Sequence, residues 1–314
     1  MRRVATILFL VAAILVPLAC RSETTTGGTG VQASSDTHAM HVVASFYPLQ
    51  FVVERVGGAL VSVTDLTPTG AEPHELELTA KSTAALADAA LVVYLSGFAP
   101  AVDAGVQSVA ADHALDVAGV AQLDLTYTPI EGGQSDPKKK GTRDPHFWLD
   151  PTRLESVATS VAARLTILDP ADAATFTANA AALTKELQVL DGDYRTGLAS
   201  CSSMVVVTSH NAFGYLSRRY GLTQVGITGL TPEDEPSPDD LARVSAYIEH
   251  NKISTIYYET LVSPVIARTV GSETGAKTMV LDPIEGLVAT SQGSDYFGVM
   301  RSNLANLRIG QGCS

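Results

Sequence analysis

The chain has 314 residues, 46% of them hydrophobic, which is enough material for two domains with buried cores. Its 33 acidic and 21 basic side chains give a formal net charge of −12. An acidic balance of this size argues against a nucleic-acid partner and against electrostatic adhesion to anionic lipid, and it suits the attraction of cations.

The N-terminus has the pattern of a secretory signal that ends in a lipidated cysteine. Arg2 and Arg3 precede an apolar run from 4 to 16, and the run leads into Leu18-Ala19-Cys20. The run is too short to span a bilayer comfortably. A cysteine directly after a small residue resembles a bacterial lipobox. We therefore predict a signal peptide over 1–19 and lipid attachment at Cys20, with a plain secretion signal as the alternative.

Cleavage before Cys20 leaves 19 basic and 33 acidic side chains, a formal charge of −14. The Thr, Gly and Ser-rich segment 20–40 then reads as a flexible tether to the membrane. The mature protein is placed outside the cytoplasm, lipid-anchored either in a periplasm or at the cell surface.

Two cysteines remain once Cys20 carries the lipid. In an oxidising compartment, Cys201 and Cys313 are expected to form a disulfide bond. The bond would join the C-terminus to the start of the second half of the chain, and the alternative is two free thiols.

Strands and helices alternate along both halves of the chain, which is the signature of parallel sheets with helices on their faces. We predict an α/β fold with two lobes, 41–168 and 200–314, each with a mainly parallel sheet flanked by helices. The expected strands are 41–46, 61–66, 91–95, 204–208, 223–227, 255–258 and 277–281. The expected helices are 49–56, 79–89, 212–220, 238–250, 264–274 and 295–307.

One long helix is predicted between the lobes, within the segment 169–199. Pro170 suits the first turn of a helix, and the stretch that follows has only one interior glycine, Gly192. Apolar residues recur every three or four positions, as on one face of an amphipathic helix. These positions are Phe176, Ala180, Leu183, Leu187, Leu190 and Tyr194. A helix of this length would be a rigid brace between the lobes.

Four side chains with metal-binding chemistry follow predicted strands or close a lobe: His74, His146, His210 and Asp282. Ligands of open parallel sheets bind at the carboxyl ends of the strands, so one cleft between the lobes can collect all four. Three imidazoles and one carboxylate suit tetrahedral Zn²⁺ and leave no position for a reacting water. This ligand set indicates a carrier of zinc more than a zinc enzyme.

Taken singly, each histidine is more often a capping or core residue than a ligand, so the prediction depends on their joint placement. Glu259 also follows a predicted strand on the side of the proposed cleft. We predict that it orients a metal-binding histidine through a hydrogen bond, with surface capping as the alternative. Asp150, which precedes Pro151, is expected to cap a helix.

From about residue 42 to 307 the chain resembles the substrate-binding lipoproteins of bacterial zinc and manganese ABC importers. The most specific segments are Glu72-Pro73-His74-Glu75-Leu76, Asp144-Pro145-His146-Phe147-Trp148, Ser209-His210-Asn211-Ala212-Phe213, Gly229-Leu230-Thr231-Pro232-Glu233 and Leu281-Asp282-Pro283. The resemblance implies two α/β lobes joined by a long helix, and metal held by His74, His146, His210 and Asp282. It also implies a monomeric receptor, not an enzyme, that delivers Zn²⁺ to a membrane permease driven by a cytoplasmic ATPase.

The third ligand position separates the members of this family. Members with histidine there resemble zinc receptors, and members with glutamate resemble manganese receptors. This chain has His210, and imidazole suits zinc whereas manganese prefers oxygen ligands. The loop 128–143 departs from many zinc-type relatives because it is short, lacks histidine and carries Lys138-Lys139-Lys140.

Three alternatives stay open from the sequence. The first is a manganese or iron receptor of the same class. The second is a secreted zinc hydrolase, against which the chain has no His-Glu-x-x-His motif. The third is an adhesin, whose partner binding would be indifferent to metal.

Overall fold

A computed structural model describes residues 39–128 and 141–314 of the chain. The predicted signal peptide, Cys20 and nearly all of the predicted tether lie outside the described residues, as do Lys138, Lys139 and Lys140. In the described part of the chain, no helix combines the length and the apolar character needed to cross a membrane.

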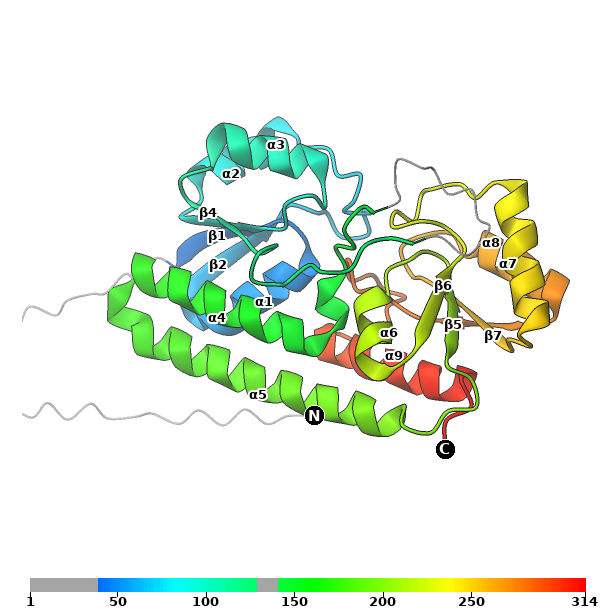
Figure 1. Ribbon diagram of the computed structural model, residues 1–314. Coiled ribbons are helices and arrows are strands. Elements are labelled where there is room, and N and C mark those ends of the chain that lie inside the picture. The colour runs from blue at the N-terminus through cyan, green and yellow to red at the C-terminus, as the bar shows by residue number, and fades with distance from the viewer. Residues whose placement is uncertain (1–38, 129–140) are drawn as a thin grey trace, which may run out of the picture. The chain divides into compact units, whose positions relative to one another are not determined.

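Two parallel sheets of four strands each form the framework (Figure 1). Their strand orders, β2-β1-β3-β4 and β6-β5-β7-β8, follow the same pattern. Parallel pairing requires a crossover between successive strands, and helices supply most of these crossovers. The strands are β1 (Met40–Ala44), β2 (Val61–Asp65), β3 (Leu91–Tyr94), β4 (Ala114–Asp116), β5 (Val205–Thr208), β6 (Thr223–Gly226), β7 (Thr255–Tyr258) and β8 (Lys277–Val280).

Helices flank both sheets, so the α/β fold class is confirmed. In the first half they are α1 (Tyr47–Gly57), α2 (Ala80–Asp88) and α3 (Pro100–Val109). In the second half they are α6 (Gly214–Tyr220), α7 (Pro238–His250), α8 (Val265–Thr274) and α9 (Tyr296–Gly310). The sequence did not predict β4 or α3, which are short or weakly patterned.

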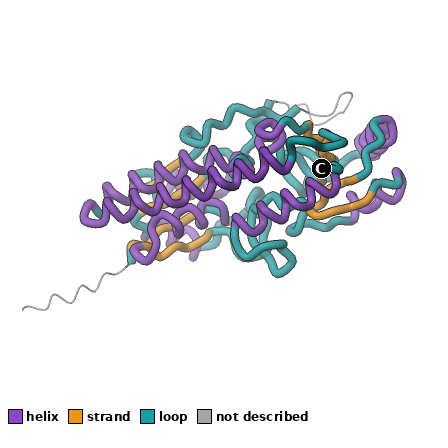
Figure 2. Tube along the Cα trace, turned by 90° about the horizontal axis from the view of Figure 1, so that it is seen from below, coloured by secondary structure: helices purple, strands orange, loops and turns teal. Residues whose placement is uncertain are grey.

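The predicted long helix is present as α5 (Ala173–Gly197), preceded by a turn of 3₁₀ helix at Pro170–Asp172. All six apolar positions of its predicted stripe are buried. Its 25 residues extend about 37 Å at 1.5 Å per residue. The helix packs along α4 (Pro151–Leu168), which the sequence had not delimited, and the two lie side by side in both views (Figure 1, Figure 2).

Asp150 caps α4 as predicted, since its side chain accepts a hydrogen bond from the backbone N–H of Thr152. The cap residue lies four residues after His146, and α4 begins one residue later. The position of His146 is thereby tied to the start of a long, well-packed helix.

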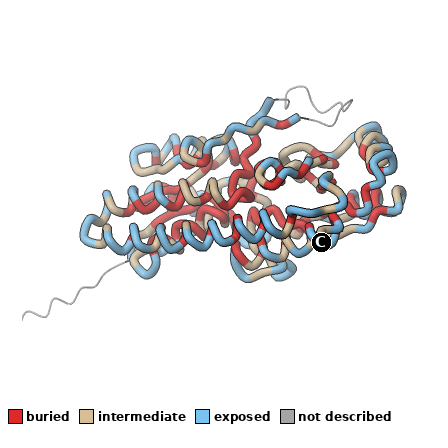
Figure 3. Tube along the Cα trace, turned by 60° about the horizontal axis from the view of Figure 1, so that its bottom comes forward, coloured by how far each residue is buried: buried red, intermediate tan, exposed pale blue. Residues whose placement is uncertain are grey.

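The main hydrophobic core does not divide between the two halves. It runs from the first sheet through α4 and α5 to α9 and one face of the second sheet. A smaller core lies between the other face of the second sheet and α7 and α8. Val206 and Val207 in β5 belong to different cores because successive strand residues point to opposite faces. In Figure 3 the buried residues lie mainly between the long helices and the rest of the chain.

Cys201 and Cys313 form the predicted disulfide bond. They are 112 residues apart in the sequence. The bond therefore joins the segment after α5 to the segment after α9. Helix α9 also packs against α5, where the Tyr194 hydroxyl donates a hydrogen bond to the Met300 carbonyl at 2.7 Å.

Candidate metal centre

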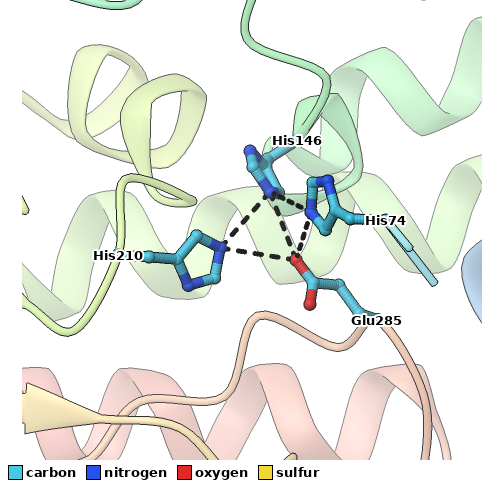
Figure 4. Close-up of side chains that lie close together, drawn as sticks. All are labelled: His74, His146, His210 and Glu285. Carbon is cyan, nitrogen blue, oxygen red and sulfur yellow. Dashed lines mark hydrogen bonds and ion pairs between the residues drawn. The ribbon is translucent and has the colours of Figure 1, made fainter. Parts of the chain in front are cut away.

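Four buried side chains meet at one point between the two sheets: His74, His146, His210 and Glu285 (Figure 4). The Nε2 atom of His146 lies 3.3 Å from that of His74 and 3.4 Å from that of His210. Oε1 of Glu285 lies 3.4, 3.2 and 3.5 Å from Nε2 of His74, His146 and His210. One ligand atom from each residue thus occupies a corner of a small tetrahedron.

Five of the six edges of this tetrahedron have lengths that fit zinc. Ligands about 2.0 to 2.1 Å from a tetrahedral Zn²⁺ are separated from one another by roughly 3.3 to 3.4 Å. The five separations given above span 3.2 to 3.5 Å. The donor set, three imidazoles and one carboxylate, also belongs to the borderline-soft chemistry that zinc accepts.

Loops carry all four residues, and His74, His210 and Glu285 follow β2, β5 and β8, whereas His146 lies in the loop that closes the first half. His74 lies between β2 and α2, and His146 directly precedes the 3₁₀ turn Phe147–Leu149. His210 follows β5 by two residues, and its carbonyl accepts hydrogen bonds from Thr208 and Gln224. Each half of the chain supplies two of the four side chains.

The structure brings Glu285, and not the expected Asp282, together with the three histidines. Asp282 is buried, but its carboxylate accepts hydrogen bonds from the backbone N–H of Ile284 and the hydroxyl of Thr260, both at 2.8 Å. Its backbone is held by the side-chain amide of Asn303, at 2.9 Å to its N–H and 2.7 Å to its carbonyl. Asp282 therefore shapes the loop that presents Glu285.

The sequence contained a signal for this arrangement. An aspartate before a proline commonly forms a turn by accepting a hydrogen bond from the backbone two residues on. Asp282 does so with Ile284. This signal indicates the turn at Asp282, but it does not show which acid of the loop faces the histidines.

Carboxylates orient two of the three histidines. Nδ1 of His210 lies 2.5 Å from Oε1 of Glu259, and Nδ1 of His146 lies 2.8 Å from Oδ1 of Asp144. With the proton of each ring on Nδ1, the lone pair of Nε2 points to the centre. Glu259 thus occupies the place that the sequence suggested, whereas Asp144 was missed although it lies only two residues before His146.

The position of the Asp144 side chain depends on Gly214, a glycine in the second half of the chain. A Cβ added at Gly214 would lie 2.4 Å from Oδ2 of Asp144. Gly214 begins α6, close after His210. The glycine therefore lets the helix that follows one histidine approach the carboxylate that orients another.

Protons compete with a cation at this centre. Burial raises the pKa of Glu285, but hydrogen bonds with the three histidines outweigh burial and hold that pKa well below its usual value. Burial lowers the pKa of His210, but the charge of Glu259 and hydrogen bonds with Glu259 and Glu285 raise it well above its usual value. Burial also lowers the pKa of His146, but hydrogen bonds with Asp144 and Glu285 raise it above its usual value. Burial lowers the pKa of His74.

Glu72 is a further acid at the edge of the centre, with Oε1 3.9 Å from Nε2 of His74. Burial, with the charge of Glu285, raises the pKa of Glu72 to about 8. Its carboxyl is therefore mostly protonated at neutral pH in the metal-free protein. The sequence did not single out this residue.

Replacing Glu259 with glutamine is expected to lower zinc affinity by about 10- to 100-fold. The amide keeps the shape of the side chain but removes the charge that holds the proton on Nδ1 of His210. Competition with a chelating indicator measures the effect. Glu186→Gln, at an exposed position on α5, is the control, and an affinity equal to that of the control would contradict the orienting role.

Known proteins are similar in sequence to this chain over most of its length. Residues 42–310 match the family described as the periplasmic component A of the zinc-uptake complex. The chain belongs to this family. It is 34% identical over 313 residues to the high-affinity zinc uptake system protein ZnuA of Bacillus subtilis, and the match covers 96% of each chain. It is 36% identical over 281 residues to the zinc-binding lipoprotein AdcA of Streptococcus pneumoniae, covering 86% of this chain and 55% of AdcA.

Solved structures of the same family share the fold. The Zn(II)-bound ZnuA-like domain of Streptococcus pneumoniae AdcA has a TM-score of 0.71 at 35% identity and covers 87% of this chain and 99% of that one. The laminin-binding protein Lmb of Streptococcus agalactiae, described as an adhesin with metal-transporting activity, has a TM-score of 0.74 at 32% identity. That match covers 87% of this chain and 100% of Lmb.

Proposed function

We propose that this protein is an extracytoplasmic receptor that captures Zn²⁺ between its two halves and delivers it to an ABC permease. The observation that carries the proposal is the tetrahedron formed by Nε2 of His74, His146 and His210 and Oε1 of Glu285. Five of its six edges, 3.2 to 3.5 Å long, match those around tetrahedral zinc, and all four ligand atoms lie within 4.8 Å of one another. Membership of a zinc-uptake family supports the same conclusion.

Zinc is the cargo in this proposal, and the chain's residues bind it without chemical change. Three neutral imidazoles and the carboxylate of Glu285 supply four ligands, which completes a tetrahedral shell. A zinc hydrolase needs an open position for water, so a complete shell favours a receptor. The family consists of components of zinc-uptake complexes, and the chain is accordingly a solute-binding receptor and not an enzyme.

The attachment and the partner of the receptor are part of the proposal. We expect a diacylated or triacylated Cys20 to hold the mature protein at the membrane, because two or more acyl chains give stable anchoring. We expect it to act as a monomer and to dock on a permease driven by a cytoplasmic ATPase. The description of the family as one component of an uptake complex supports such a partner.

Competition between metals tests the choice of cargo. Trp148 lies two residues from His146 and is the only tryptophan of the chain, so its fluorescence can report binding. Metal-free protein titrated with Zn²⁺ and Mn²⁺ at equal free concentrations should take up zinc in preference, because imidazole nitrogens bind zinc better than manganese. His210→Ala should remove most of the zinc response. A preference for Mn²⁺ would overturn zinc as the cargo.

Zinc affinity is expected to rise with pH through neutrality. The raised pKa values of His146 and His210 mean that metal-free protein holds protons that Zn²⁺ must displace. Each proton displaced makes the dissociation constant fall about tenfold per pH unit, until the pH exceeds the raised pKa values, which lie above the usual imidazole pKa of about 6.5. Dissociation constants measured from about pH 5 to about pH 8 test this, and an affinity that does not change with pH would rule out these ligands.

A further inference from the structure

We propose that Trp148 is a positioning residue of the metal centre, which holds the loop of Glu285 at the distance from the histidines that zinc requires. The inference rests on the proposed function, because it concerns the same centre. Trp148 contacts no metal in this proposal. It acts by joining the loop that carries His146 to the loop that carries Glu285.

Two hydrogen bonds hold Trp148, one to the loop of Glu285 and one from the start of α9. Its indole Nε1–H donates to the carbonyl oxygen of Pro283 at 2.7 Å, across 135 residues of sequence. Its own carbonyl accepts from the hydroxyl of Tyr296 at 2.6 Å. Trp148 follows His146 by two residues, and Pro283 precedes Glu285 by two. The indole bond therefore links two positions that each lie two residues from a side chain of the centre.

The indole ring also supports the histidines of the first half. Its centroid lies 5.2 Å from that of His146 and 5.6 Å from that of Phe98. The ring of Phe98 lies 4.4 Å from the ring of His74. Because Trp148 is fully buried, a change in its position would be transmitted to His74, His146 and Glu285 together.

The Glu285 loop needs such support because its backbone is strained. Ile284, a buried β-branched residue, has a φ of +61°, in the left-handed region that favours glycine. A conformation of this kind persists only where the surroundings hold it. Asn303 holds the loop at Asp282 from the second half, and Trp148 holds it at Pro283 from the first.

The variant Trp148→Phe tests the inference, since phenylalanine keeps an aromatic ring and removes the N–H. The matched control is Tyr194→Phe, which also removes a buried donor to a backbone carbonyl, at Met300, away from the centre. Zinc dissociation into excess chelator and the visible absorption of the Co²⁺-loaded protein are measured, because tetrahedral Co²⁺ absorbs more strongly than Co²⁺ with added water ligands.

We expect Trp148→Phe to release zinc about 10- to 100-fold faster and to weaken the Co²⁺ absorption, with Tyr194→Phe close to the wild type. Equal rates and spectra in Trp148→Phe and the wild type, or equal acceleration in both variants, would overturn the inference. If Trp148→Phe does not fold, Tyr296→Phe replaces it, since it frees the Trp148 carbonyl. The same acceleration then supports the inference, and an unchanged rate overturns it.

Glu285→Ala in the same experiment separates this inference from the proposed function. If Glu285→Ala loses zinc while Trp148→Phe behaves as the wild type, the receptor function stands and the positioning role fails. If Glu285→Ala retains zinc as the wild type does, the proposed centre itself is refuted.

Discussion

Glu285→Ala is expected to weaken zinc binding by about a hundredfold or more, whereas Asp282→Asn should weaken it by less than about tenfold. Four-ligand zinc sites bind with about 10 to 16 kcal/mol, so one ligand contributes on the order of 3 kcal/mol, or roughly a hundredfold. The amide introduced by Asp282→Asn would keep an oxygen that accepts the hydrogen bond from Ile284, so the loop should hold its course. Competition with a chelating indicator measures both affinities.

The two variants distinguish between the two acids of one loop. If Asp282 were the ligand, Asp282→Asn would remove a coordinating charge, and Glu285→Ala would remove a side chain that does not bind the metal. A larger loss for Asp282→Asn than for Glu285→Ala would therefore restore the sequence-based expectation. Tm values of the two metal-free variants close to that of the metal-free wild type would exclude unfolding as the cause of a loss.

Removing the Cys201–Cys313 bond is expected to lower the free energy of unfolding by up to about 4 to 5 kcal/mol. The bond spans 112 residues, and a cross-link over a loop of this length restricts the unfolded chain strongly. Urea unfolding of the metal-free Cys201→Ser, Cys313→Ser double variant measures the loss. The effect is large because whole domains are commonly stable by only about 5 to 15 kcal/mol.

The double variant should retain its zinc affinity, since the hydrogen bonds of Trp148 and Asn303 that hold the loop of Glu285 do not involve the cysteines. A stability equal to that of the wild type would contradict the predicted loss. A loss of zinc binding in the folded variant would show instead that the bond shapes the centre.

Several features of the fold followed from local rules. The alternation of strands and helices predicted two parallel sheets, because a parallel strand pair needs a crossover. The apolar stripe from Phe176 to Tyr194 predicted α5, because helical periodicity fixes which side chains share a face. Cys201 and Cys313 could be paired because only these two remained once Cys20 was assigned to the lipid.

The three histidines were predictable for the same kind of reason. The carboxyl ends of parallel strands gather at one edge of a sheet, so residues that follow those strands lie near one another whatever the details of packing. His210, two residues after β5, illustrates how little the tertiary structure had to add.

The fourth side chain of the centre depended on long-range contacts. Asp282 and Glu285 lie three residues apart in one loop, and periodicity does not distinguish them. The choice follows from the backbone between them, where Ile284 has a positive φ and Pro283 accepts a hydrogen bond from Trp148, 135 residues away.

The sequence by itself therefore determined the fold class, the long helix and the three histidines, because these follow from periodicity and strand topology. Only the tertiary structure decided that Glu285 faces them while Asp282 holds the loop, because that depends on contacts between distant parts of the chain.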